Sequence, residues 1–203
     1  MDYRNLSVAE KIEQVQEYRP CGAEIKYQAA YLNALQSGDM QAIADYETFG
    51  DSPRKIIMNL NSYRQGETFG FTGREFNEYG WLENAHFTNV EHIKFFHKKD
   101  WAAHNYITIG CGANGKWSYG ASYSTGGAGG GYGLGIWGKV FESRKKCLAA
   151  ALRELSDRHA EQRKQHIKDD CNFNSTLSNT IVKQVTVMLN ELTVAKQLTF
   201  SFF

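Results

Sequence analysis

Glycine is concentrated in one segment of this 203-residue chain, where 12 of the 19 glycines fall between Gly110 and Gly138. Large rings alternate with small residues in part of that segment, as in 117–123. Such alternation is typical of a half-buried strand, and Asn114-Gly115 is a strong signal for a two-residue hairpin turn. The segment therefore predicts the strands and turns of a small antiparallel sheet.

Three strands are predicted, over residues 104–110, 116–124 and 133–141. The third offers Leu134 and Ile136 to a core. Between the second and third, the glycines of residues 125–132 predict a mobile loop. The backbone N–H groups of such a loop are accessible to an anion, and a flexible hairpin tip is the alternative interpretation.

Two nucleotide-binding motifs are spelled in the same segment. Residues 110–116 match a P-loop up to its last position, which needs Ser or Thr and here holds Trp117. The spacing of Gly110, Gly112 and Gly115 also matches a dinucleotide fingerprint, but no strand–helix–strand unit surrounds it. A hairpin accounts for these glycines better than a nucleotide site does.

The remaining segments have helical signals. Ser7 and Glu10 have the spacing of a capping box, and Ser52-Pro53 begins a further helix. A long helix is predicted from Ser143, and a last one over about 175–196. The predicted fold class is α+β: a helical N-terminal region (1–64), an aromatic-rich connection (65–100), a β-β-β-α-α domain (101–196) and a tail (197–203).

Charge and composition narrow the function classes. The net charge is only +1, yet residues 1–51 carry nine acids and four bases, which leaves the later part basic and permits nucleic-acid contact there. No apolar run is long enough for a membrane span, and no signal peptide is recognisable. We therefore expect a cytoplasmic protein that does not bind membranes, and no motif predicts a cofactor.

The side chains predicted to bind nucleic acid or a partner are the basic ones of the long helix and the aromatic ones of the strands. They are Arg144, Lys145, Lys146, Arg158, Arg163, Lys164, Lys168, Trp117, Tyr119 and Tyr132. Basic residues would contact phosphates, and rings on an open sheet face would stack on bases. Two alternatives stay open, since acids interleave with the helix's bases and the rings would equally serve to pack the sheet on the helix.

Four histidines fall close together in the sequence, namely His86, His92, His97 and His104. Imidazoles near Glu91 and Asp100 would allow a metal-dependent phosphodiesterase or nuclease, which is the alternative function. Their spacing fits no helical H-x-x-x-H pair, so surface or half-buried histidines are the preferred interpretation and no metal site is predicted.

The segment Gln197-Leu-Thr-Phe-Ser-Phe-Phe203 resembles the sliding-clamp-binding peptides of bacterial replication and repair proteins. The resemblance implies that Gln197 makes polar contacts while Leu198, Phe200 and Phe202 enter an apolar pocket of the clamp. A final edge strand packed on the domain is the alternative.

Residues 101–160 resemble small Gly/Trp-rich β-β-β-α modules of accessory proteins in phages, plasmids and conjugative elements of gut bacteria. The features that match are the Asn114-Gly115 hairpin, the Gly/aromatic segment ending at Phe141 and the helix over 143–155. The resemblance implies a mobile-element origin and no reaction. We therefore expect a non-enzymatic interaction protein whose partner is a sliding clamp or a nucleic-acid-targeting defence effector, as for an anti-CRISPR inhibitor.

Overall fold

The computed structural model describes residues 3–83, 86–95, 104–166 and 168–198, with side chains as far as Leu192. The chain divides into two compact units, Met1–Ala85 and His86–Phe203. Each unit has its own hydrophobic core and is described by itself. None of the helices in the described ranges is long and apolar enough to cross a membrane.

Unit 1 is helical. Its elements are the 3-10 helix η1 (Tyr3–Asn5) and the helices α1 (Val8–Glu17), α2 (Ile25–Ser37), α3 (Met40–Glu47) and α4 (Pro53–Glu67). The capping box predicted at Ser7 is present, because Ser7 Oγ accepts from the Glu10 N–H while the Glu10 carboxylate accepts from the Ser7 N–H. Gly38 ends α2 in the left-handed conformation with a φ of 68°.

A buried polar group lies at the centre of unit 1. The Glu47 carboxylate is 2.7 Å from the Lys11 ammonium and accepts a 3.0 Å hydrogen bond from the Tyr31 hydroxyl. The Tyr3 hydroxyl is 3.1 Å from that of Tyr31, and burial raises the pKa of Tyr3 to about 12. The buried lysine is therefore paired, as a charge removed from water must be.

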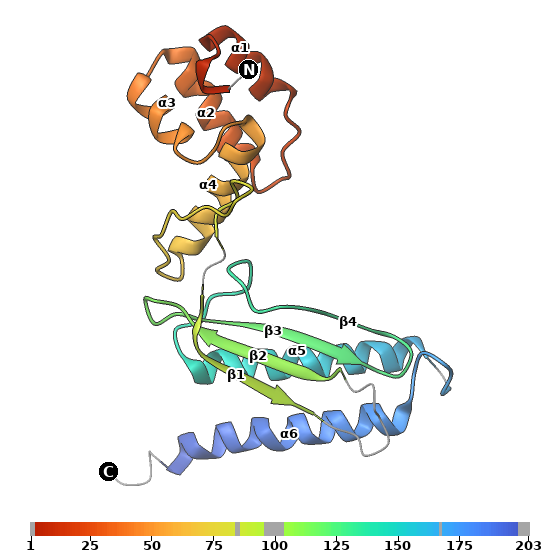
Figure 1. Ribbon diagram of the computed structural model, residues 1–203. Helices are drawn as coiled ribbons and strands as arrows, with labels where there is room; N and C mark the ends of the chain where they lie inside the picture. Colours follow the sequence, from red (N-terminus) through yellow and green to blue (C-terminus); the bar gives the residue numbers. More distant parts are fainter. Residues whose placement is uncertain (1–2, 84–85, 96–103, 167, 199–203) are drawn as a thin grey trace. The chain divides into compact units, whose positions relative to one another are not determined.

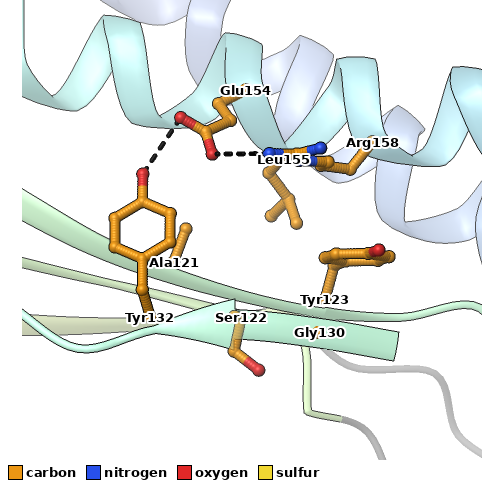
Figure 2. Close-up of a pocket in the computed structure, with 9 residues that line it drawn as sticks. Ala121, Ser122, Tyr123, Gly130, Tyr132, Glu154, Leu155 and Arg158 are labelled. Atoms are coloured by element: carbon orange, nitrogen blue, oxygen red, sulfur yellow. Dashed lines mark hydrogen bonds and ion pairs between the residues drawn. The ribbon is translucent and has the colours of Figure 1, made fainter. Parts of the chain in front are cut away.

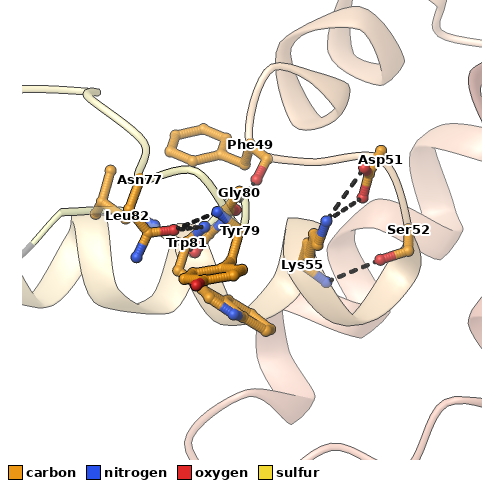
Figure 3. Close-up of polar contacts among 10 residues, drawn as sticks. Phe49, Asp51, Ser52, Lys55, Asn77, Tyr79, Gly80, Trp81 and Leu82 are labelled. Atoms are coloured by element: carbon orange, nitrogen blue, oxygen red, sulfur yellow. Dashed lines mark hydrogen bonds and ion pairs between the residues drawn. The ribbon is translucent and has the colours of Figure 1, made fainter.

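The loop after α4 is fastened to that helix by Asn59. The Asn59 amide donates to the backbone carbonyls of Phe49 (2.7 Å) and Gly80 (2.9 Å), while its carbonyl accepts from the Leu82 N–H (2.9 Å). Within the loop, the Asn77 side chain accepts from the backbone N–H groups of Tyr79 and Trp81 (Figure 3). The aromatic-rich segment after α4 is thus ordered by side-chain amides as far as Leu82.

Unit 2 is an antiparallel sheet followed by two long helices (Figure 1). The strands β1 (Thr88–Lys94), β2 (Tyr106–Cys111), β3 (Trp117–Ser124) and β4 (Gly129–Tyr132) lie in the order β1-β2-β3-β4, and α5 (Arg144–Gln165) and α6 (Ser175–Leu198) follow. Ile107, Ile109, Tyr119 and Ala121 form the face that packs on Leu152 and its neighbours in α5 and α6. The α+β class is confirmed.

The prediction of three strands was wrong, because the sheet has four. The first two predicted strands are β2 and β3, whereas β1 lies in the segment that we expected to be an irregular connection. The predicted strand over 133–141 is not a strand. Its residues form turns that rejoin β3 only through a bridge between Trp117 and Phe141, and the last strand lies at 129–132, inside the predicted mobile loop.

Close packing explains this difference. A Cβ atom on Gly120 would lie 2.4 Å from the backbone of Gly133 and Leu134, and one on Gly110 would lie 2.6 Å from the Leu134 side chain. The segment after β4 therefore crosses directly over these two glycines of the sheet. Glycine at 110 and 120 makes room for the segment that covers the sheet. The residues next to these glycines in the sequence give no signal of that contact.

A buried hydrogen-bond network joins both helices of unit 2 to the sheet. His159 is 0% exposed; its Nε2 donates to the Asn105 side-chain carbonyl (3.0 Å) and its Nδ1 accepts from the Ser178 hydroxyl (3.1 Å). The Asn105 amide exchanges two 3.0 Å hydrogen bonds with the backbone of Ser124. Burial lowers the pKa of His159 to about 4, so the imidazole is neutral in the folded protein.

This network makes stability depend on pH. Because the pKa of His159 is about 4 in the folded protein and 6.5 in an exposed histidine, the unfolded chain binds more protons between these pH values. We expect the free energy of unfolding to have its full value above pH 6.5 and to fall by up to roughly 3 kcal/mol as the pH drops toward 4. Urea unfolding at a series of pH values measures this, and His159→Gln should have the shallower slope. Parallel slopes for the two proteins would contradict the assignment.

The covering segment gives a second prediction. Gly120→Ala should lower the free energy of unfolding by about 2 to 3 kcal/mol, because the new methyl group meets backbone atoms that cannot move aside freely. Gly135→Ala is the matched control, since nothing lies within 4 Å of a Cβ at that position. Equal urea midpoints for both variants would show that the segment after β4 does not rest on the sheet.

Candidate partner-binding site at the sheet edge

Strand β4 is an edge of the sheet with few side chains. It pairs with β3 only, from Ala121 with Tyr132 to Ser124 with Gly129, and its residues are exposed. Three consecutive glycines leave this edge without the lysine, proline or bulge that commonly protects one. The opposite edge, β1, differs: its register shifts between Thr88 and Glu91, and Asn89 has a φ of 48°. Of the two edges, β4 is the one open to a further strand.

A hollow of about 240 Å³ lies between β4 and α5 (Figure 2). Gly130 pairs with Tyr123 on the face toward α5, and because it has no side chain the space beside Tyr123 stays empty. Leu155 and Arg158 of α5 and Tyr132 of β4 complete the lining. The missing side chain of Gly130 thus produces a pocket directly beside an unpaired strand edge.

The Glu154 carboxylate lines this pocket and contacts the side chains around it. Glu154 Oε2 accepts hydrogen bonds from the hydroxyls of Tyr119 (2.6 Å) and Tyr132 (3.0 Å), and Oε1 lies 3.7 Å from the Arg158 guanidinium. Figure 2 shows the contacts of Glu154 with Tyr132 and Arg158. Burial, followed by contact with Glu154 for Tyr119, raises the pKa of both tyrosines. Tyr132 is therefore a neutral, fixed ring at the end of the strand.

A wider hollow of about 690 Å³ continues along α5 from the same tyrosines. It is lined by Trp137, Lys139, Arg153 and Asp157, among others. Trp137 is 60% exposed and Tyr132 45% exposed. Exposed tryptophan, tyrosine and arginine side chains around one hollow are typical of the residues that contribute most to protein–protein binding.

The basic residues predicted from the sequence do not form one surface. Arg144 is held by Glu91 through two 2.5 Å hydrogen bonds, which also lower the pKa of Glu91. Arg163 hydrogen-bonds Asn179, and Arg158 lies between Glu154 and Glu161. Of the predicted bases, Lys145, Lys146, Lys164 and Lys168 are exposed and form no ion pair with the residues that the structure describes.

The predicted aromatic residues also separate. Tyr119 is 2% exposed in the core, so no base can stack on its ring without opening the unit, and Trp117 packs against the same core. Of the three predicted aromatic residues, Tyr132 is the exposed one. Trp137 and Lys139 were missing from the predicted site because 133–141 was interpreted as a strand, and Arg153 of α5 was not among the bases predicted to bind.

The remaining predicted residues do not gather into a site. His86, His92 and His104 are exposed, and His92 Nδ1 lies 2.9 Å from the Thr108 hydroxyl. Among the residues that the structure describes, no three His, Cys, Asp or Glu side chains are grouped to hold a metal ion. His97, Phe200 and Phe202 lie outside those residues, as do the side chains of Gln197 and Leu198.

Glu154 supplies a testable contact. Glu154→Ala should lower the free energy of unfolding by about 1 to 3 kcal/mol, because the buried Tyr119 hydroxyl loses its acceptor. Tyr132→Phe removes a hydrogen bond at an exposed ring and should cost less than about 1 kcal/mol. Urea unfolding measures both, with Asp157→Ala on the exposed side of α5 as the control. A loss for Asp157→Ala as large as that for Glu154→Ala would contradict this role.

Comparison of the chain with protein-family models, with curated proteins and with solved structures gave no match.

Proposed function

We propose that this chain is a non-enzymatic interaction protein that binds an extended segment of a protein partner along β4. The observation that carries the proposal is the combination of an unpaired glycine edge with a pocket that opens beside it. An added strand would hydrogen-bond to the β4 backbone through its own main chain. Its side chains would alternate between the two faces of the sheet.

The pocket indicates what such a segment would carry. A residue of the added strand on the α5 face would point toward Tyr123, Leu155 and the stem of Arg158. A large apolar or aromatic side chain fits this lining, since it buries apolar surface while the polar tip of Arg158 stays hydrated. Trp137 and Arg153 would contact the partner along the wider hollow.

We further propose that the partner belongs to host DNA-processing or nucleic-acid-targeting defence machinery, and that the protein derives from a phage or another mobile element. The support is the resemblance of residues 101–160 to accessory modules of mobile elements. Inhibition of a CRISPR effector is the concrete form of this proposal. Binding of a sliding clamp through residues 197–203 is a separate route to the same class of partner.

Binding through β4 is tested by capture experiments with purified defence effectors and sliding clamp. Trp137→Ala should reduce partner capture by at least about tenfold, as expected for an exposed tryptophan at the centre of a contact. Gly133→Lys should do the same by placing a charge beside the edge, where nothing lies within 4 Å of a Cβ. Biolayer interferometry on immobilised full-length protein gives the affinities.

Tyr106→Ala is the matched control, because Tyr106 is an aromatic residue of the same sheet that is 37% exposed and lines neither hollow. It should leave capture unchanged. Equal loss for Tyr106→Ala and Trp137→Ala would show a different binding face. A variant without residues 197–203 separates the routes, since loss of clamp binding alone would identify the tail as the clamp-binding element.

A further inference from the structure

Unit 1 contains a groove of about 550 Å³ with an uncommon combination of side chains. Three rings and three cations line it: Tyr27, Tyr46, Phe49, Lys26, Arg64 and Arg74. Its volume lies within the range of small-molecule sites, which is about 300 to 1,000 Å³. The groove belongs to unit 1 alone and is separate from the β4 edge.

Arg74 lies over two aromatic rings, that of Phe49, which lines the groove, and that of Tyr63, which packs on Phe49. Its guanidinium carbon is 4.8 Å from the ring centroid of Phe49 and 4.8 Å from that of Tyr63. These two buried rings lie 5.3 Å apart and are tilted by 58°. Stacking on aromatic faces fixes the guanidinium, whose planar fork of N–H donors matches a phosphate or carboxylate.

Arg74 has no carboxylate partner among the residues that the structure describes, although unit 1 is rich in acids. Residues 1–85 contain 13 acids and eight bases, a net charge of −5. Three other bases of the unit are paired: Lys11 with Glu47, Lys55 with Asp51 and Arg64 with Glu67. Lys26 and Arg54, like Arg74, form no ion pair with the described residues. The exposed Arg74 guanidinium lies over two rings beside the groove and has no acid beside it, so it is available to an anionic ligand.

The other lining groups specify more of that ligand. Tyr27 and Tyr46 supply aromatic rings to the lining, and the ammonium of Lys26 lies 4.7 Å from the Tyr27 ring centroid. Asp45 brings a carboxylate to the same groove, and a carboxylate accepts hydrogen bonds from ligand hydroxyls. The site therefore combines a cationic end, aromatic walls and a hydroxyl acceptor.

We propose that this groove binds a nucleoside phosphate. The phosphate contacts Arg74 and Lys26, the base lies against the tyrosine rings, and the ribose hydroxyls donate to Asp45. A free mononucleotide is the form that fits, because the negative charge of unit 1 repels a long polyanion. This site serves small-ligand binding and does not depend on the partner proposed for β4.

Isothermal titration of the full-length protein with AMP and UMP at low ionic strength tests the proposal. Both nucleotides should bind, and adenosine should bind at least about tenfold more weakly, because charge-assisted hydrogen bonds to the phosphate are lost. Arg74→Gln should weaken AMP binding by about tenfold or more. Arg54→Gln is the matched control and should change it less than about twofold; Arg54 also lies over a ring, that of Trp81, but does not line the groove.

Three results would overturn the proposal. They are no binding of AMP or UMP up to about 10 mM, equal affinity for adenosine and AMP, and a short oligothymidylate that binds more tightly than either nucleotide. If circular dichroism shows Arg74→Gln to be unfolded, Asp45→Asn replaces it. That variant should abolish the preference for AMP over its 2′,3′-dideoxy form, and an unchanged preference would remove Asp45 from the site.

Discussion

The buried contacts of His159 hold unit 2 together, because they link four segments that are distant in the sequence. Asn105 precedes β2, Ser124 ends β3, His159 belongs to α5 and Ser178 to α6. Each of these buried groups would cost free energy if its partner moved away, since a polar atom without water or a hydrogen bond is unstable in a core. The sheet and both helices of unit 2 are therefore fixed relative to one another. This also fixes the position from which the chain turns into β4.

That placement extends to the edge strand through Thr125. The Thr125 carbonyl accepts a 2.6 Å hydrogen bond from the Asn174 N–H, and its hydroxyl donates to the carbonyl of Asn172. Gly127 donates to the Cys171 carbonyl at 2.9 Å. The turn before β4 is thus fastened to the segment that precedes α6. A glycine run that local rules interpret as a mobile loop becomes a strand because both of its ends are fixed by contacts distant in the sequence.

Sequence reasoning succeeded where the determinants are local and failed where they are not. Ser7 with Glu10, Ser52 with Pro53 and Ser143 begin helices as predicted, because a cap depends on residues within one turn. Whether Arg144 is available to a phosphate depends on its contact with Glu91, 53 residues away. Whether glycine is needed at position 120 depends on the backbone of Leu134, which lies against it. Likewise, Tyr119 and Tyr132 were predicted to belong to one binding surface, yet the first is buried against α5 and the second lies at an edge. Period alone does not distinguish a strand with neighbours on both sides from one at the end of a sheet.

Side-chain hydrogen bonds hold β4 near both of its ends but not along its middle. Tyr132 is held by Glu154 at one end and Thr125 by Asn172 at the other, while Gly129–Gly131 have no side chains to hold them. Glycine in a strand costs about 0.5 to 1 kcal/mol per residue relative to alanine, because more backbone freedom is lost. Main-chain hydrogen bonds from an added strand would offset part of that cost, and the fixed ends would keep the register. A weak strand between two firm anchors therefore suits the addition of a partner segment better than either a free loop or a rigid, self-sufficient strand would.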